Sequence, residues 1–228
     1  MMIPETLKKS SIFKVLKDED LHDISASFEE RSFRNNEYVF MEGDPSDFLY
    51  LVAKGRVKML KHSEKGKDVI LEIKSPGELF CCSAVLDERP FPESAQAMDD
   101  GSVIKIRREK LLDIMERYPD LKVEIARYSG EKLKEAHEML KNIATEKAEG
   151  RIASILLKFS ETGGYSDSEF VKISVSLTRQ EIADMVGTTV ETCIRTISKF
   201  QKEGMVKSDS HNLLVNRSLL KKFLESLQ

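Results

Sequence analysis

The sequence predicts an α+β fold made of an antiparallel β-roll, a long amphipathic helix and a winged helix-turn-helix. Residues 33–106 alternate apolar and polar side chains, which is typical of half-buried strands. Apolar residues in 126–143 repeat at heptad spacing, and residues 177–215 follow a helix–turn–helix–hairpin pattern. The expected domains are residues 1–118, 119–148 and 149–228.

The composition of the 228 residues is that of a globular protein, with 40% hydrophobic and 33% charged residues. No segment approaches the roughly 18 consecutive apolar residues of a membrane-spanning helix, and residues 1–11 lack the apolar core of a signal peptide. The sequence therefore predicts a cytoplasmic protein without membrane contact. Three cysteines without metal spacing do not predict a disulfide scaffold.

The charge is distributed unevenly. From Gly150 onward the sequence has 11 Lys and Arg against 9 Asp and Glu, a net charge of +2, whereas the rest of the chain carries −5. Phosphate contacts need local rather than global positive charge. The C-terminal part can therefore bind DNA although the whole chain has a net charge of −3.

Short helices are expected in the first thirty residues, and the strands of the roll follow. Leu49 with Leu51, and Val69 with Leu71 and Ile73, mark strands by their alternation. A small β-sandwich is the alternative to the roll. Glycines at regular intervals indicate the turns of successive hairpins: Gly43, Gly55, Gly66 and Gly77.

The long helix carries a seam of small and large residues spaced by three and four. Because a helix is stabilised mainly by packing its apolar face, this seam needs a partner. We expect a second copy of the same helix, which would make a two-fold symmetric homodimer; packing on the chain's own roll is the alternative. Gly150 is expected to end the helix. The seam residues are Ala126, Ser129, Leu133, Ala136, Leu140 and Ile143.

A helix-turn-helix is predicted from Leu177 onward. Thr178 and Glu181 have the spacing of a capping box, and Gly187 supplies the turn because a positive φ is cheap for glycine. The second helix is expected over residues 190–203, and a wing of two short strands over residues 205–215.

The second helix separates two faces, one of which (Cys193, Ile197 and Phe200) is expected in the core. The other face suits the DNA major groove, where Arg donates to guanine, Glu accepts from cytosine and apolar groups contact the thymine methyl. A helical hairpin that binds no DNA is the alternative. The expected base contacts are Val190, Glu191, Ile194 and Arg195, and the expected phosphate contacts are Thr178, Arg179, Gln180, Thr192 and Lys199.

Two groups of residues make the sequence resemble the CRP/FNR superfamily of transcription regulators over nearly the whole chain. They are Val39–Pro45, Leu49–Leu51, Gly55–Lys58 and Pro76–Glu78, and then Thr178–Ala183, Gly187, Val190–Thr192 and Arg195. The resemblance implies a cyclic-nucleotide-binding-like jelly roll, a dimerising helix and a domain that reads palindromic double-stranded DNA. Glu191 and Arg195 match the family's main base-contacting residues. RNA polymerase is an implied partner, for an activator or a repressor.

The effector pocket departs from the cyclic-nucleotide members, which hold the ribose with a Gly-Glu pair and the phosphate with Arg-Ser. Cys82 stands in place of that Glu and Glu93 in place of that Arg. A carboxylate would repel a phosphate, so cyclic AMP is not expected. The cysteines of the FNR iron–sulfur cluster are absent, which excludes that cofactor in one protomer. The expected pocket residues are Cys81, Cys82, Ser83, Arg89, Glu93, Ser94 and His137.

Several effector hypotheses stay open. Phe80-Cys81 is similar to the carbon-monoxide-sensing haem branch, and residues 69–72 and 94–97 are similar to the nitric-oxide-responsive branch. Haem held by Cys81 and His137 is therefore one hypothesis. Redox-sensitive thiols at Cys81 and Cys82, an unidentified small molecule and no ligand are the others. A disulfide between the adjacent cysteines is not expected, because neighbouring strand residues point to opposite faces.

A different class of function is also open: the roll could be a regulatory module for a cyclic nucleotide or another small molecule, with a C-terminal domain that docks protein rather than DNA. An enzyme is not expected, since no nucleophile–base set is present. The roll resembles cupins, but the histidines are too scattered for a cupin metal site; they are His22, His62, His137 and His211.

Overall fold

The computed structural model describes residues 3–62, 68–161, 169–173, 175–209 and 212–227. The chain forms two compact units, Met1–Glu135 and Ala136–Gln228, and the boundary falls within the long helix α5 (Asp120–Thr145). Among the described helices, none is long and apolar enough to cross a membrane.

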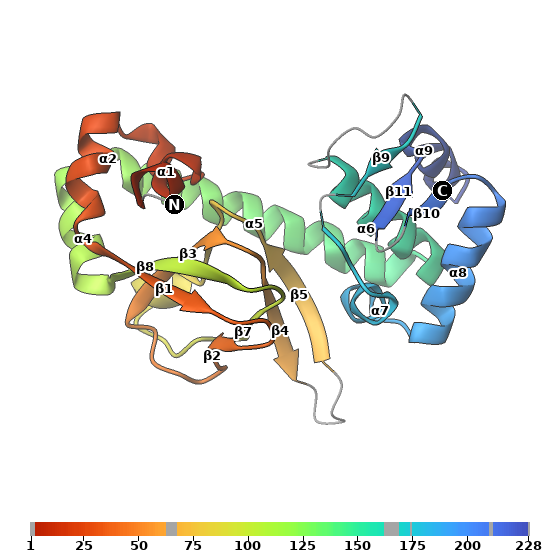
Figure 1. The fold of residues 1–228 in the computed structure, drawn as a ribbon, viewed down its shortest axis with the longest axis horizontal. Coiled ribbons are helices and arrows are strands. Elements are labelled where there is room, and N and C mark those ends of the chain that lie inside the picture. Colours follow the sequence, from red (N-terminus) through yellow and green to blue (C-terminus); the bar gives the residue numbers. More distant parts are fainter. Residues whose placement is uncertain (1–2, 63–67, 162–168, 174, 210–211, 228) are drawn as a thin grey trace. The chain divides into compact units, whose positions relative to one another are not determined.

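Short helices open the first unit, as the spacing of its apolar residues predicts (Figure 1). They bury Leu7 and Phe13, and the ring of Phe13 meets Phe28 edge-on with centroids 5.6 Å apart. Phe28 belongs to the first strand of the roll, so the helical spacing ends before it. The helices are α1 (Ile3–Lys9), the 3-10 helix η1 (Phe13–Val15) and α2 (Asp18–Ser25).

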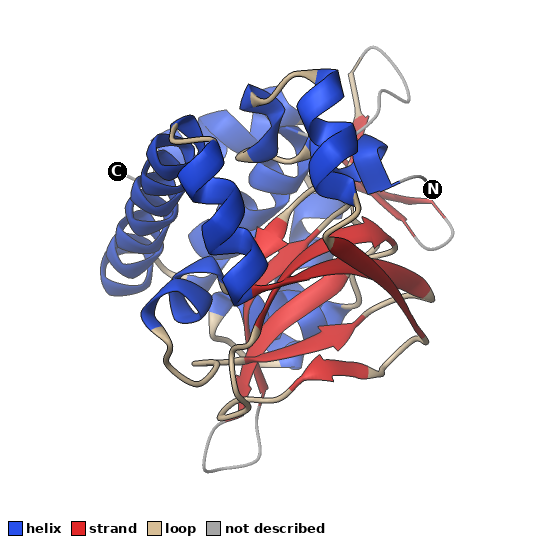
Figure 2. Ribbon diagram, turned by 90° about the vertical axis from the view of Figure 1, so that its left-hand side faces the viewer, coloured by secondary structure: helices blue, strands red, loops and turns tan. Residues whose placement is uncertain are grey.

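The β-roll consists of two four-stranded antiparallel sheets within the described residues, ordered β1-β8-β3-β6 and β2-β7-β4-β5 (Figure 2). This confirms the α+β class. The strands are β1 (Phe28–Phe33), β2 (Tyr38–Phe40), β3 (Phe48–Lys54), β4 (Val57–His62), β5 (Asp68–Lys74), β6 (Leu79–Phe80), β7 (Ser94–Ala97) and β8 (Gly101–Arg107).

Four aromatic rings fill part of the interior of the roll. Phe40 stacks on Phe91 with centroids 3.7 Å apart, and Tyr50 stacks on Phe80 with centroids 5.6 Å apart. All four residues are at most 7% exposed. Packed aromatic pairs stabilise a core beyond what the burial of their apolar surface alone contributes. The turns lie where the glycines predict them: Gly43, Gly55 and Gly77 have positive φ, while Gly66 lies outside the described residues.

Two apolar residues of β5 that mark the predicted strand, Val69 and Leu71, do not face the core. Val69 and Leu71 are each 37% exposed, whereas Ile70 is 1% exposed. Met59 pairs with Glu72 but Leu60 pairs with Ile70, so Leu71 is an extra residue opposite β4. Such a bulge shifts the alternation by one residue and moves side chains to the other face.

The first unit ends with helices that pack on the roll. Leu121 and Ile125 of α5 are buried against the core of the roll. Tyr118, just before α5, donates to an Asp20 carboxylate oxygen at 3.0 Å and so joins α2 to the start of α5. The other helices here are α3 (Cys82–Asp87) and α4 (Arg108–Arg117).

The helix break predicted at Gly150 is displaced. α5 ends at Thr145 and the next helix, α6, spans Ala148–Glu161, so Gly150 lies inside α6. A Cβ atom on Gly150 would lie 3.1 Å from Leu227 Cδ1 and 3.1 Å from Glu146 Oε2. Close packing, rather than helix termination, explains the glycine.

The second unit is the predicted winged helix-turn-helix. The helices α7 (Arg179–Val186) and α8 (Val190–Lys202) are joined by Gly187, whose φ is +65°. The wing strands are β10 (Val206–Asp209) and β11 (Asn212–Val215), with β9 (Val171–Lys172) beside β11, and the last helix is α9 (Arg217–Glu225).

The capping box of α7 forms as predicted. The Glu181 backbone N–H donates to Thr178 Oγ1 at 3.1 Å, and the Thr178 backbone N–H donates to Glu181 Oε2 at 2.8 Å. Removal of an N-cap side chain typically costs about 1 kcal/mol. We expect Thr178→Ala to lower the free energy of unfolding by about that amount in urea titrations followed by circular dichroism. Ser198→Ala, which removes an exposed hydroxyl of α8, should leave it unchanged.

Candidate DNA interface and effector pocket

The recognition helix α8 presents the two faces that its sequence predicts. Cys193 and Phe200 are fully buried and Ile197 is 1% exposed. On the other face Ile194 is 49% exposed, and Glu191 and Arg195 are also exposed. An exposed isoleucine between charged side chains leaves apolar surface available for a thymine methyl group. All the predicted base contacts therefore lie outside the core, with Val190 partly buried at the helix start.

Contacts from α6 and from the turn hold the helix pair in place. Arg151 Nε donates to the Val186 carbonyl at 2.8 Å, and its Nη1 donates to the Glu146 carbonyl at 2.7 Å. The Thr192 backbone N–H donates to Thr189 Oγ1 at 3.2 Å, which caps α8. The bonds from Arg151 satisfy carbonyl groups that the ends of α7 and α5 leave open, and the bond from Thr192 to Thr189 fixes where α8 begins.

The predicted phosphate-contacting residues cluster at the starts of α7 and α8. Thr178 is engaged in the capping box, and Gln180 Nε2 donates to Asp184 Oδ1 at 2.7 Å. Lys199 lies near the other end of α8, where its Nζ donates to Glu149 Oε2 at 2.8 Å. A phosphate contact by Lys199 would replace that exposed ion pair. Arg179 is partly buried, and Thr192 accepts from the Thr189 hydroxyl at 3.2 Å.

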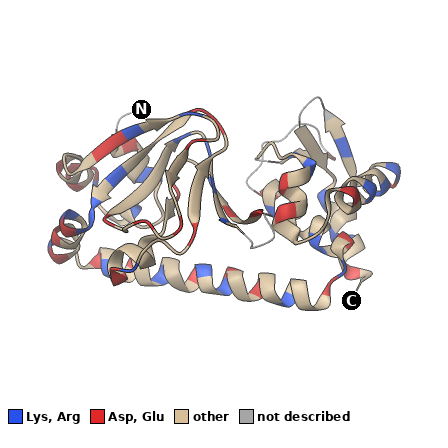
Figure 3. Cartoon of the chain, turned by 90° about the horizontal axis from the view of Figure 1, so that it is seen from below, with Lys and Arg blue, Asp and Glu red and all other residues tan. Residues whose placement is uncertain are grey.

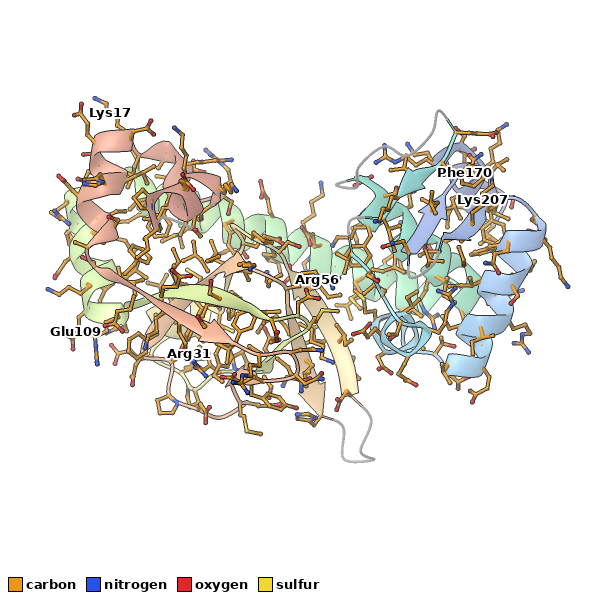
Figure 4. All side chains as sticks on the ribbon, in the orientation of Figure 1. Lys17, Arg31, Arg56, Glu109, Phe170 and Lys207 are labelled. Carbon is orange, nitrogen blue, oxygen red and sulfur yellow. The ribbon has the colours of Figure 1, made fainter. Side chains whose placement is uncertain are left out.

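The wing adds a cation that the sequence reading does not single out. Lys207 Nζ lies 3.9 Å from the ring centroid of Phe170, and Figure 4 shows the two side chains side by side. At the same place Gln201 of α8 donates to Ser208 Oγ at 2.7 Å. The bond between Gln201 and Ser208 joins the wing to the recognition helix, and Lys207 is an exposed cation next to it, so Lys207 is a further candidate for a phosphate contact.

The predicted seam of α5 is exposed along its length. Leu133, Leu140 and Ile143 are 58%, 62% and 50% exposed, and Ala126, Ser129 and Ala136 are exposed too. Lys, Arg, Asp and Glu occur at intervals along α5 (Figure 3). A row of large exposed apolar residues on one helix is typical of an interaction surface.

Cys81 and Cys82 do not lie in a strand, contrary to the prediction. Cys81 has φ +58° in the turn before α3, and Cys82 is the first residue of that helix. Burial and the charge of Glu93 raise the pKa of the Cys81 thiol, and burial raises that of Cys82 to about 12. Thiols react as thiolates, so these surroundings disfavour a redox-sensitive role at neutral pH.

Glu93 is an acidic residue of the expected effector pocket and lies beside Cys81. Its Oε1 accepts a weak hydrogen bond from Cys81 Sγ at 3.9 Å, and the described residues give it no ion pair. Burial and the nearby Glu72 raise its pKa, against the opposing effect of Lys74. Ser94 beside it is 1% exposed and accepts from the Glu42 backbone N–H at 2.9 Å. The place where a phosphate would be expected thus holds a carboxyl group.

The raised pKa of Glu93 predicts a pH-dependent effect of Glu93→Gln. The folded state binds the Glu93 proton more tightly than the unfolded state, so ionising this carboxyl destabilises the fold as pH rises above the usual glutamate range. We expect Glu93→Gln to raise the Tm at pH 7.5 and to raise it less at pH 4.5. A loss of stability at pH 7.5 would mean that the ionised carboxylate has a favourable partner. Differential scanning calorimetry at both pH values measures this.

Three of the predicted pocket residues have exposed side chains. Arg89 has a 78% exposed side chain and pairs with Asp87 at 2.7 Å, so it does not replace the missing phosphate-binding arginine. Ser83 is exposed on α3. His137 is exposed on α5 and belongs to the second unit. Within the described ranges, no three His, Cys, Asp or Glu side chains are arranged to hold a metal ion; His211 lies outside these ranges.

A charged network between β5 and α5 is missing from the sequence prediction. Glu72 accepts from Lys132 at 2.5 Å and pairs with Lys74 at 2.6 Å. Lys74 also donates to the Tyr128 hydroxyl at 3.2 Å, and that hydroxyl donates to the Leu79 carbonyl at 2.9 Å. The Lys74 side chain is only 3% exposed. A lysine at the end of an apolar strand resembles an ordinary strand end, so its burial gives no sequence signal.

Comparisons with known proteins agree with this architecture. Residues 30–118 match the family described as cyclic nucleotide-binding domain, and residues 150–223 match the Crp-like helix-turn-helix domain. The CRP-like cAMP-activated global transcriptional regulator of Mycobacterium tuberculosis is 23% identical over 214 residues, covering 94% of this chain and 96% of the relative. The transcriptional activator protein Anr of Pseudomonas aeruginosa is 27% identical over 192 residues, covering 83% of this chain and 77% of the relative.

The fold is shared with solved structures. FixK2 from Bradyrhizobium japonicum superposes with a TM-score of 0.75 at 22% identity, covering 86% of this chain and 96% of that chain. The two matching domains occur in the order of the roll and the helix-turn-helix, and the relatives are transcription regulators rather than enzymes. The chain belongs to the CRP/FNR family and is a DNA-binding transcription regulator.

Proposed function

We propose that two copies of the chain pair through the seam of α5 and read a two-fold symmetric DNA site with their α8 helices. The observation that carries the proposal is the exposed face of α8, where Ile194, Glu191 and Arg195 lie together outside the core. A dimer places two such helices in successive major grooves, about 34 Å apart.

The seam supports a second copy of this chain as the partner of α5. Leu121 and Ile125 already bury one face of the helix against the roll, while Leu133 on another face is 58% exposed. The heptad seam mixes small and large residues, so the small residues of one copy can receive the large residues of an identical copy across a two-fold axis. Packing of Leu133 on the chain's own roll is therefore disfavoured.

We further propose that the effector is not cyclic AMP, although the relative from Mycobacterium tuberculosis is described as cAMP-activated. The carboxyl of Glu93 would face the phosphate, and Arg89 points to solvent in its pair with Asp87. Bringing two negative charges together in a partly buried site is unfavourable.

Calorimetric titration with cyclic AMP tests this part of the proposal. We expect no saturable heat at millimolar cyclic AMP, and a change in DNA affinity of less than about twofold. Glu93→Arg, which supplies a cation at that position, is expected to gain measurable affinity for cyclic AMP. Saturable binding to the unchanged chain would contradict the proposal.

Haem is the second hypothesis for the effector. A cysteine ligand binds iron as a thiolate, whereas burial and Glu93 raise the pKa of the Cys81 thiol. The surroundings of Cys81 therefore do not favour it as a haem ligand. We expect haem titration to give a broad, non-saturating absorption band. A sharp Soret band that saturates at one haem per chain and is lost in Cys81→Ser would establish haem instead.

Contact with RNA polymerase stays a prediction. The alternative of a C-terminal domain that docks protein rather than DNA is not carried further, because residues 150–223 match the Crp-like helix-turn-helix domain and the relatives are transcription regulators.

A further inference from the structure

We propose that the network of Glu72, Lys74, Tyr128 and Lys132 sets the rotation of α5 about its axis and thereby decides which face of the helix meets the partner protomer. Lys132 and Tyr128 are positioning residues in this account. The inference rests on the proposed dimer, because it concerns how the seam is presented.

The arrangement along α5 is the first argument. Leu121, Ile125, Tyr128 and Lys132 are spaced by four, three and four residues, so they lie on one face of the helix. The first two are buried in the core of the roll, and the last two bond to β5 and β6. Ala126, Ser129 and Leu133, by contrast, are exposed. The contacts to the roll thus leave the seam face outward.

The direction of the bonds is the second argument. Hydrophobic contacts at Leu121 and Ile125 are tolerant of small rotations, because apolar burial has no preferred direction. Hydrogen bonds weaken steeply when their angle changes. The Tyr128 hydroxyl is held from two sides, by Lys74 at 3.2 Å and by the Leu79 carbonyl at 2.9 Å, so the network resists rotation.

The charges are the third argument. Glu72 lies between Lys74 and Lys132, and although burial alone would raise its pKa, these two cations hold that pKa below the usual range. The bond to Glu72 also raises the pKa of Lys132 against the effects of burial and Lys74. Both groups stay charged near neutral pH, and a partly buried pair of this kind is held more firmly than an exposed one.

Lys132→Ala is the most informative variant, because it leaves the Glu72–Lys74 pair intact and so spares the buried lysine. Lys134→Ala is the matched control, since Lys134 is an exposed lysine on the same helix. Tyr128→Phe removes the hydroxyl and keeps the ring. We expect Lys132→Ala and Tyr128→Phe to raise the dimer dissociation constant about tenfold. Lys132→Arg can still bond to Glu72, so its dimer dissociation constant should equal that of the unchanged chain.

Disulfide cross-linking between protomers measures which face of α5 meets the partner. Ser129→Cys places a thiol on the seam, and Glu131→Cys places one away from it. The cross-linking rate of the unchanged chain, which has only the native cysteines, is subtracted from each rate. In the otherwise unchanged chain, Ser129→Cys should cross-link several-fold faster than Glu131→Cys. Adding Lys132→Ala should bring the two rates close together, with the Tm of the roll unchanged.

The outcomes separate this inference from the proposed dimer. If Ser129→Cys cross-links no faster than Glu131→Cys in the unchanged chain, the seam is wrong and the inference falls with it. If the seam thiol cross-links faster and Lys132→Ala leaves the ratio unchanged, the dimer stands and the network does not set the rotation.

Discussion

Replacing Arg195 with alanine is expected to lower the affinity for specific DNA about 100-fold, because a good contact to a base edge is worth about 1–3 kcal/mol and a symmetric dimer makes it twice. Arg195 is exposed on the outer face of α8. Its replacement leaves the buried Cys193, Ile197 and Phe200 untouched, so the fold is expected to remain intact. Fluorescence anisotropy with a selected duplex and with a random duplex measures the effect.

Lys202→Ala is the matched control for Arg195→Ala. Lys202 is an exposed cation in the last turn of the same helix, and its removal changes the net charge equally. We expect a much smaller loss, of the same size on specific and random DNA, because the attraction of an exposed lysine to phosphates does not depend on the DNA sequence. Equal losses for the two variants on the selected duplex would remove Arg195 from the base-reading residues.

Leu140→Glu is expected to separate the dimer into monomers. The Leu140 side chain is 62% exposed in the single chain, so the replacement does not disturb a core. In the two-fold dimer, two carboxylates would meet across an apolar seam, and an unpaired buried charge costs several kcal/mol. We expect the dimer dissociation constant to rise at least about 100-fold and the affinity for a palindromic duplex to fall with it.

Sedimentation equilibrium measures the state of the Leu140→Glu chain. Lys134→Glu is the control, because it introduces the same carboxylate at an exposed position of α5 away from the seam. A dimer that persists in Leu140→Glu would show that another surface holds the two copies together. Unchanged helix content by circular dichroism would establish that the helix itself is intact.

The helix-turn-helix could be predicted because its signals are local. Thr178 and Glu181 are three residues apart and bond to each other as a capping box, and Gly187 adopts the positive φ that its turn needs. Cys193, Ile197 and Phe200 share one face of α8 through helical spacing alone. In each case the determining contacts lie within a few residues of chain.

The features that escaped prediction depend on distant residues. Lys132 meets a carboxylate 60 residues earlier in the chain, and nothing near Lys132 in the sequence indicates that pair. The bulge at Leu71 depends on how β5 pairs with β4, and the close packing at Gly150 depends in part on Leu227, 77 residues later in the chain. Arg89 is a pocket candidate because it lies near Glu93 in the sequence, but its side chain is exposed and pairs with Asp87.

Selection of binding sequences from a randomised duplex library, with the purified full chain, tests the central claim most directly. The account predicts an inverted repeat whose half-sites are centred about 10 base pairs apart, and the loss of at least one selected base in each half-site for Arg195→Ala. A selected pool without any symmetric motif would contradict binding by a dimer. The same motif for the unchanged chain and for Arg195→Ala would contradict base recognition by this face of α8.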